Sequence, residues 1–222
     1  MDSSRGGAPA AHDQALAFGD SQSATTEMTA GRTDLSAAQA PRSRPARIRV
    51  RRLDGGDLFP ASGISDATVR IDELARHGVS ARGILILSNE AVFDALPELP
   101  RAIAFLGSSS QLAALRELPW LTGRRIHYWA DIDTAGFSQL DQLRASLPQT
   151  ASVLMDAWTL WSHREQWTRE LMPSRHVLPH LTVAESVVYA DLVSDTLAPS
   201  VRLRQESIDE STVLRELARA LR

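Results

Sequence analysis

Residues 125–137 read RIHYWADIDTAGF, and this stretch decides the fold class that the sequence predicts. An apolar run at residues 126–129 leads to Asp131 and Asp133, and Gly136 then precedes a stretch with helical periodicity. Short apolar runs bounded by polar residues are typical of strands buried in a parallel sheet. The stretch therefore predicts a buried strand, a turn that carries two carboxylates, and a helix.

The same pattern recurs on both sides of this stretch. Further apolar runs cover residues 84–87, 102–106 and 153–155, and helix-like stretches cover residues 91–96, 111–118, 137–147 and 158–171. Two more helices are predicted at residues 182–193, where Thr182 and Glu185 form a capping box, and at residues 207–221. Alternation of strands and helices is typical of a parallel sheet with helices on its faces. The sequence therefore predicts the α/β class, with a mainly parallel sheet flanked by helices.

Arginine dominates the segment before the first of these strands. Residues 42–52 read RSRPARIRVRR and combine six arginines with Ile48 and Val50 in alternation. Alternation predicts a short strand with one solvated face. One interpretation is a strip that contacts the phosphate groups of DNA. The other, which we favour, is a charged strand at the edge of the sheet that discourages aggregation.

Composition restricts the classes of function. The absence of cysteine excludes disulfides and thiolate metal sites and is compatible with a reducing cytoplasm, where we expect the protein to act. All 24 basic residues are arginine, which excludes a lysine Schiff base and a P-loop lysine. The formal net charge of −3 provides no overall attraction for nucleic acid. No apolar run is long enough to span a membrane, and the N-terminus lacks a signal-peptide pattern.

Residues 1–45 differ in composition from the rest of the chain. They are rich in Ala, Ser, Gly, Thr and Gln and contain few large apolar residues. Such a segment does not bury enough apolar surface to offset its conformational entropy. We therefore expect a disordered N-terminal tail over residues 1–45 and one domain over residues 46–222. A misassigned start codon is an alternative explanation for the tail.

Asp131 and Asp133 form the main candidate site. Residues two apart in an extended segment point to the same side, so both carboxylates converge at the C-terminal edge of the sheet, where open α/β folds place their sites. Two carboxylates with water in the remaining positions suit Mg²⁺. Alternatively, one aspartate caps the next helix and the other is solvated. The spacing alone leaves both alternatives open.

Other polar and aromatic residues have simpler interpretations. Asp156 follows the last apolar run, and we interpret it as a helix cap and not as a further metal ligand. Large aromatic side chains are mostly buried, so the tryptophans are interpreted as packing residues and not as base-stacking residues. They are Trp120, Trp129, Trp158, Trp161 and Trp167.

Several segments, in this order, resemble the C-terminal domain of JetD, a subunit of Wadjet plasmid-defence systems. They are GILILSNEAVFDALPEL (83–99), AIAFLGSSSQLAALRELPWL (102–121), the stretch from residue 125 quoted above, VLMDAWTLWSHREQW (153–167) and RLRQESI (202–208). The resemblance covers roughly residues 48–221. That family belongs to the Toprim group and is related to the A subunit of topoisomerase VI. The resemblance therefore implies a Toprim-like Rossmannoid domain.

The resemblance also implies a metal site. Toprim domains of this kind hold Mg²⁺ with one acidic residue after the first strand and a DxD pair after a later strand. Asp131 and Asp133 match the pair. Ser88 stands where the family has glutamate, and Glu90 lies two residues further on. The resemblance thus implies Asp131, Asp133 and Glu90 as the catalytic and metal-binding residues, with Ser88 as a departure that puts catalysis in doubt.

The leading hypothesis is a Mg²⁺-dependent DNA nuclease module of a Wadjet-type system, either active or catalytically degenerate. Its implied partners are plasmid DNA and condensin-like Wadjet subunits, with homodimerisation as an option and no membrane. The alternative is a non-enzymatic domain that keeps the Toprim core and binds DNA or protein. A phosphatase of the haloacid dehalogenase group is disfavoured, because Ala135 stands where the DxDx[TV] motif requires threonine or valine.

Overall fold

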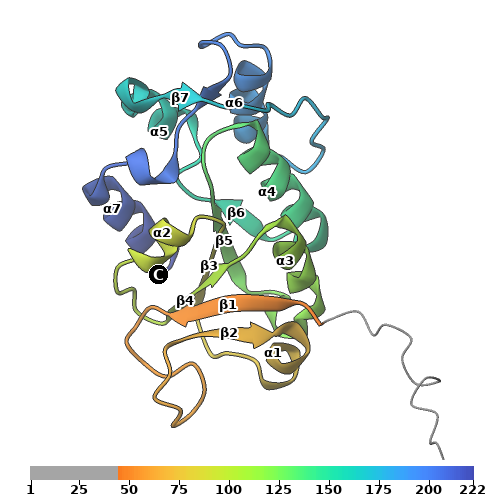
Figure 1. Ribbon diagram of the computed structural model, residues 1–222, viewed down its shortest axis with the longest axis vertical. Helices are drawn as coiled ribbons and strands as arrows, with labels where there is room; N and C mark the ends of the chain where they lie inside the picture. Colours follow the sequence, from red (N-terminus) through yellow and green to blue (C-terminus); the bar gives the residue numbers. More distant parts are fainter. Residues whose placement is uncertain (1–44) are drawn as a thin grey trace, which may run out of the picture. The chain divides into compact units, whose positions relative to one another are not determined.

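A six-stranded sheet organises the domain, which the computed structural model describes over residues 45–222 (Figure 1). The strand order is β2-β1-β4-β3-β5-β6. The strands are β1 (Arg47–Arg52), β2 (Asp66–Arg70), β3 (Gly83–Leu87), β4 (Ala102–Leu106), β5 (Arg125–Trp129) and β6 (Thr150–Ser152). β4, β3, β5 and β6 are parallel neighbours, and β1 is antiparallel to β2 and β4. The predicted α/β class with a mainly parallel sheet is confirmed. The predicted tail covers residues 1–45, and all of it except Pro45 lies outside the described residues.

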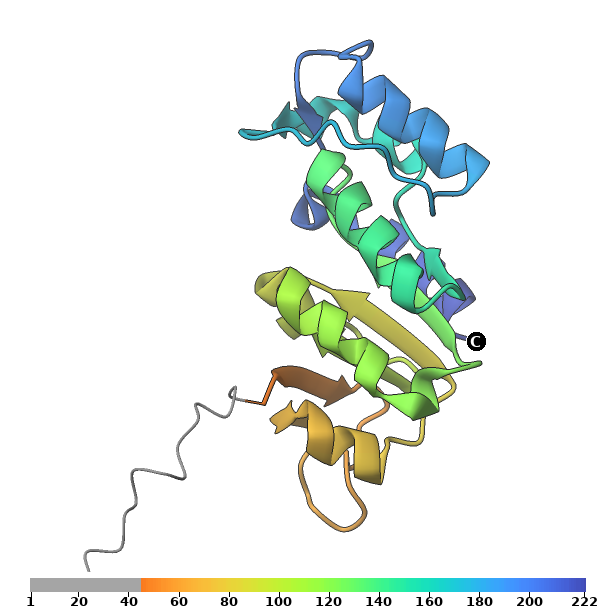
Figure 2. The same cartoon turned by 90° about the vertical axis from the view of Figure 1, so that its right-hand side faces the viewer.

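Helices cover both faces of the sheet. α1, α3 and α4 lie on one face, and α2 and α7 lie on the other (Figures 1 and 2). The helices are α1 (Ile71–His77), α2 (Glu90–Asp94), α3 (Ser109–Ala113), α4 (Thr134–Ser146), α5 (Ala157–Ser162), α6 (Val183–Val193) and α7 (Glu210–Ala220). None of the helices within residues 45–222 combines the length and the apolar character that crossing a membrane requires.

Two helix caps form as the sequence predicts. The Asp156 carboxylate accepts a hydrogen bond from the backbone N–H of Thr159 (2.8 Å) at the start of α5. At the start of α6, the Glu185 carboxylate accepts from the Thr182 N–H (2.7 Å), and the Thr182 hydroxyl accepts from the Glu185 N–H (3.3 Å). Such contacts satisfy N–H groups that have no partner within the helix. Both predictions rest on neighbours within three residues and are confirmed.

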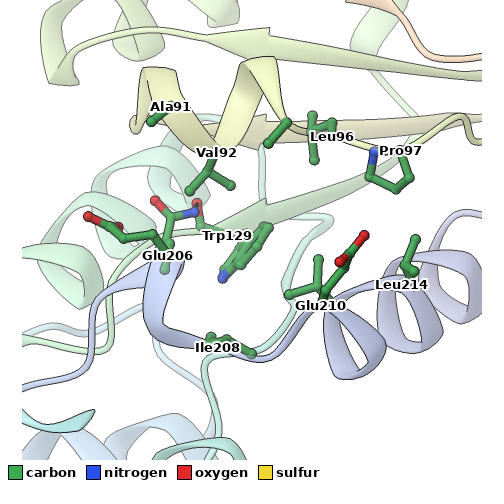
Figure 3. Close-up of a pocket in the computed structure, with 12 residues that line it drawn as sticks. Ala91, Val92, Leu96, Pro97, Trp129, Glu206, Ile208, Glu210 and Leu214 are labelled. Atoms are coloured by element: carbon green, nitrogen blue, oxygen red, sulfur yellow. Dashed lines mark hydrogen bonds between the residues drawn. The ribbon is translucent and has the colours of Figure 1, made fainter.

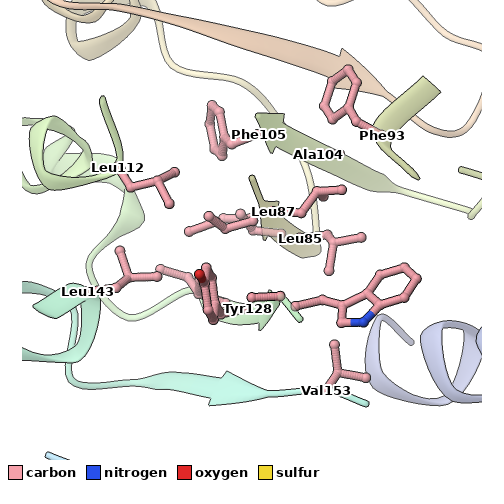
Figure 4. Close-up of a cluster of buried hydrophobic side chains, with 14 of the residues drawn as sticks. Leu85, Leu87, Phe93, Ala104, Phe105, Leu112, Tyr128, Leu143 and Val153 are labelled. Atoms are coloured by element: carbon pink, nitrogen blue, oxygen red, sulfur yellow. The ribbon is translucent and has the colours of Figure 1, made fainter. Parts of the chain in front are cut away.

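The core follows from strands that are covered on both faces. Every residue of β3, GILIL, is buried. Figure 4 shows Leu85 and Leu87 on the same side of the sheet as Phe93, and Phe105 of β4, Tyr128 of β5 and Leu143 of α4 on the opposite side. A continuous apolar run suits a strand with helices on both sides, because neither face meets water. These buried strands give the loops at their C-terminal ends a fixed base.

The arginine-rich strand occupies a different place from the one we favour on sequence. β1 lies between β2 and β4, so the edge-strand interpretation is wrong. Ile48 and Val50 are fully buried. On the alternate side, Arg49 Nη2 lies 2.7 Å from an oxygen of Asp66 and 2.9 Å from an oxygen of Asp94. The edge strand is β2, which the sequence does not predict. Its residues, DATVR, are only half-buried and form no clear apolar run.

Two further expectations between β5 and α6 need correction. No strand forms at the predicted residues 153–155, because β6 ends at Ser152 and the backbone leaves the extended region at Leu154 (φ 58°). The helix predicted at residues 158–171 ends at Ser162. It is followed by the 3₁₀ helix η4 (Arg164–Gln166) and β7 (Thr168–Arg169), which pairs with β8 (Val201–Arg202). Trp129 is buried as expected, whereas Trp158 and Trp161 are more than half exposed and contradict the packing interpretation.

Candidate functional site

The candidate site lies at the C-terminal end of β5. β5 ends at Trp129, and α4 begins at Thr134. Asp131 and Asp133, in the connection, both line a cavity of about 200 Å³. Ser88 and Asn89, which follow β3, line the same cavity. The structure therefore brings the two aspartates together at the sheet edge where open α/β folds place their sites.

Gly136 allows the tight turn that positions both carboxylates. A β-carbon at this residue would lie 2.2 Å from the backbone oxygen of Asp131 and 3.3 Å from Oδ1 of Asp133. The first distance is far shorter than any van der Waals contact, so a larger residue would force the turn open. The glycine is thus required by close approach of the backbone.

Asp133 is the N-terminal cap of α4. Its Oδ1 accepts a hydrogen bond from the Gly136 N–H (2.7 Å), and the side chain is buried. Burial raises the pKa of Asp133 to about 7; the Gly136 hydrogen bond acts against this, and the charges of Glu170 and Asp131 add to it. The helix-cap role that the sequence left open is therefore present for this residue, and its carboxyl group titrates close to neutral pH.

Asp131 is held by the C-terminal segment and is not solvated. Arg202, in β8, donates to Asp131 Oδ2 from Nε (2.8 Å) and from Nη2. The backbone N–H of Gln205 donates to Oδ1 (2.8 Å). Arg202 Nε also lies 3.2 Å from Oδ2 of Asp133. One guanidinium group therefore contacts both carboxylates.

A short antiparallel bridge brings these segments together. The N–H of Ile132 donates to the carbonyl of Leu203 (2.9 Å), and the N–H of Leu203 donates to the carbonyl of Ile132 (3.0 Å). Both side chains are fully buried. The bridge fixes residues 202–205 alongside residues 131–133, which places Arg202 next to the acidic pair.

The start of α4 is occupied by a second charged side chain. Glu170, directly after β7, is buried. Its carboxylate accepts hydrogen bonds from the N–H of Thr134 (3.1 Å), the hydroxyl of Thr134 (2.8 Å) and the N–H of Ala135 (3.2 Å). A helix N-terminus is a common anion-binding position. Here an internal carboxylate fills it, so the β7–β8 sheet supplies a partner both to the acidic pair and to the helix end.

Glu90 is not brought to the two aspartates. It begins α2, its side chain is 75% exposed, and Oε1 lies 3.3 Å from Nη1 of Arg49. Ser88 is exposed and lines the cavity, so the position where the resemblance expects glutamate carries only a hydroxyl group. Within residues 45–222 no group of three or more His, Cys, Asp or Glu residues is placed to hold a metal ion.

The side chains around Asp131 and Asp133 do not fit Mg²⁺ in this arrangement. Mg²⁺ requires a nearly octahedral shell of oxygen ligands. The two aspartates accept hydrogen bonds from Gly136, Gln205 and Arg202, and the Arg202 guanidinium supplies the positive charge between segments. A second cation at the same carboxylates would be repelled by this guanidinium. The arrangement is an ion cluster in which one guanidinium offsets one of the two carboxylate charges.

Sequence reasoning missed Arg202 and Glu170. Glu170 directly follows β7, and Arg202 lies in β8. Neither short strand shows a periodic pattern in the sequence. A weak signal does exist: Val201–Leu203 reads VRL, in which an arginine alternates with two apolar residues, as in a half-buried strand. No pattern in the sequence, however, indicates which carboxylate such an arginine would meet.

Comparison with known proteins identifies a relationship over most of the chain. A family model described as Wadjet protein JetD, C-terminal, matches residues 35–217. A search of curated proteins finds no match.

Proposed function

Since the chain belongs to the family of Wadjet JetD C-terminal domains, we propose that it is a non-cleaving interaction domain of a Wadjet plasmid-defence system, built on a Toprim-type core. Its partner is another, condensin-like subunit of that system. A cytoplasmic location is part of the same proposal, because plasmids reside there. Homodimerisation would be compatible with this role.

One observation carries the proposal: Arg202 contacts both Asp131 and Asp133. These are the two carboxylates on which metal-dependent cleavage would depend. Removing one partner of a buried or half-buried ion pair costs free energy, and so does moving the arginine away from the carboxylates. The pair therefore supports a structural role for the acidic strand end, and the exposed position of Glu90 beside Arg49 supports it further.

Protein is favoured over DNA as the partner. The net charge is −3, and three of the four arginines of β1, Arg49, Arg51 and Arg52, are engaged within the domain. Arg49 contacts Asp66, Asp94 and Glu90, and Arg52 contacts Asp54. The charge of an arginine that faces carboxylates is offset by them, so such an arginine attracts phosphate groups only weakly.

Nicking of supercoiled plasmid tests the proposal. We expect no nicking by the wild-type protein with Mg²⁺ or Mn²⁺, and none by Arg202→Gln. Arg219→Gln is the matched control, because Arg219 is a highly exposed arginine on α7. Nicking by the wild-type protein that Asp131→Ala abolishes would overturn the proposal.

A second candidate function is Mg²⁺-dependent DNA endonuclease activity, with Asp131, Asp133 and Glu90 as metal-binding and catalytic residues. The cavity beside the aspartates favours it, because about 200 Å³ has room for several water molecules of about 30 Å³ each. This activity requires Arg202 to leave the aspartates and Glu90 to leave Arg49. In a nicking assay, Glu90→Gln would then abolish activity, whereas Glu117→Gln, at an exposed glutamate beyond α3, would not.

A further inference from the structure

A groove lies between α2 and the C-terminal segment that leads into α7 (Figure 3). Its volume is about 470 Å³, within the range of roughly 300–1,000 Å³ that is usual for binding pockets. Most of its lining is apolar, and the main residues are Ala91, Val92, Leu96, Trp129, Ile208 and Leu214. Leu214 is 39% exposed, so the groove opens to solvent on the α7 side.

Trp129 lines the groove with its indole ring. The side chain is 1% exposed, and its Nε1 is buried without a hydrogen-bond partner among residues 45–222. Trp120 and Trp167 each donate to a backbone carbonyl at 2.9 Å, those of Leu74 and Leu160. Figure 3 shows the indole of Trp129 between Val92 and Ile208, with its nitrogen towards Ile208. Since the nitrogen is not accessible from the groove, the indole contributes apolar surface to it.

The charged groups at the groove are acidic. Glu206 and Glu210 are exposed and line it, and no arginine of the described part of the chain does. Glu206 contacts Arg204 (2.5 Å) and accepts a hydrogen bond from Asn89 (2.9 Å), whereas no ion pair involves Glu210 within residues 45–222. An acidic rim attracts basic groups and repels phosphate, which argues against nucleic acid at this face.

We propose that this groove binds a large apolar side chain carried by a basic segment of a protein partner. The apolar side chain fills the groove against the indole of Trp129, and a neighbouring basic residue faces Glu210. Apolar anchors in a pocket with a charged rim are the usual centre of a protein–protein interface. The inference rests on the proposed interaction role and names the surface that would carry it.

The test uses the full chain and synthetic peptides followed by NMR of the tryptophan indole N–H groups. The probe is an end-blocked Arg-Arg-Leu-Leu-Arg peptide, and the comparison peptides are its Glu-Glu-Leu-Leu-Glu and Arg-Arg-Ser-Ser-Arg counterparts. Trp129→Phe identifies the Trp129 signal. We expect the Arg-Leu peptide to shift this signal strongly and the other two peptides to shift it little.

Two pairs of variants locate the binding. Leu214→Arg, at the groove, should weaken binding by about tenfold or more, while Val187→Arg, at another exposed apolar position on α6, should not. Glu210→Gln should weaken binding at low salt, and Glu117→Gln should not. Equal binding of the acidic peptide, an equal shift caused by a short DNA duplex, or no loss in Leu214→Arg would overturn the inference. Plasmid nicking by the wild-type protein is measured in a separate assay. A failure of the proposed function is therefore distinguishable from a failure of peptide binding in the groove.

Discussion

Arg202 is hydrogen-bonded to Asp131 across 71 residues of sequence, and the same guanidinium lies 3.2 Å from Asp133. The contact joins β8 to the turn after β5 and closes the acidic strand end. Because the guanidinium is itself a cation, it offsets one of the two carboxylate charges.

The first prediction concerns metal binding. Wild-type protein should show no Mg²⁺ binding by calorimetry, and Arg202→Gln should bind Mg²⁺ weakly, because the two carboxylates lose their cation. Ser88→Glu added to Arg202→Gln should strengthen binding, since a third carboxylate adds both a ligand and charge. Arg219→Gln is the control. Mg²⁺ binding by the wild-type protein of the same strength as by Arg202→Gln would contradict the role given to Arg202.

The second prediction concerns pH. Burial raises the pKa of Asp133 to about 7, well above the value of an unfolded aspartate. Folding therefore favours the protonated carboxyl group, and its contribution to stability is lost as pH rises from about 4 to about 7. The free energy of unfolding should fall by on the order of 1 kcal/mol or more over this window.

Asp133→Asn tests the assignment of this pH dependence. Asparagine does not titrate and still presents an oxygen to the Gly136 N–H. Chemical denaturation between pH 4 and 8 should show a smaller pH slope in this variant, whereas Asp57→Asn, at an exposed aspartate, should keep the wild-type slope. An unchanged slope in Asp133→Asn would show that another group titrates.

The third prediction concerns the buried ion pair between α4 and α6. Arg144 contacts Glu185 through two hydrogen bonds (2.6 and 2.9 Å), and both side chains are at most 10% exposed. Removing one partner leaves a buried charge, so Arg144→Ala should destabilise the domain by about 3–5 kcal/mol. Arg175→Ala, at an exposed pair with Asp195, should cost about 0–1 kcal/mol. Thermal and chemical denaturation measure both, and equal losses would refute the argument.

The same pair predicts a loss of stability in acid. Burial alone raises the pKa of Glu185, but hydrogen bonds from Arg144, Ser152 and Thr182 outweigh it and lower the pKa to about 2. Stability from Glu185 is therefore complete above its unfolded pKa of about 4.5 and is lost as pH falls towards 2. Glu185→Gln should lack this component of acid denaturation. An acid transition of unchanged steepness in that variant would exclude Glu185 as its source.

The fourth prediction concerns the arginines of β1. Arg49 bonds Asp66 at 3.0 and 2.7 Å, and Arg51 donates to the carbonyls of Phe93 and Asp94 at 3.0 Å. Arg49→Gln should therefore lower the free energy of unfolding by about 1–3 kcal/mol. It should leave the salt dependence of any DNA binding unchanged, with Arg116→Gln as an exposed control. A flatter salt dependence in Arg49→Gln would restore the phosphate-contacting interpretation.

The sequence by itself determined the features that depend on near neighbours. The apolar runs predict β3, β4 and β5, because a strand that is buried on both faces requires apolar side chains throughout. Asp156 and the Thr182–Glu185 pair predict helix starts, because a cap and its N–H partner lie within three residues. The two aspartates at the end of β5 follow from the period of an extended chain.

Only the tertiary structure decided which partners the charged residues meet. Arg202 and Glu170 reach the acidic turn because the β7–β8 sheet and the Ile132–Leu203 bridge bring that segment to the end of β5. Glu90 turns to Arg49 because β1 is an interior strand next to β4. Charge attraction has no sequence period and acts between whichever groups the packed core brings within a few ångströms. The sequence therefore places carboxylates at a strand end, and the packing of distant segments decides whether they meet a metal ion or an arginine.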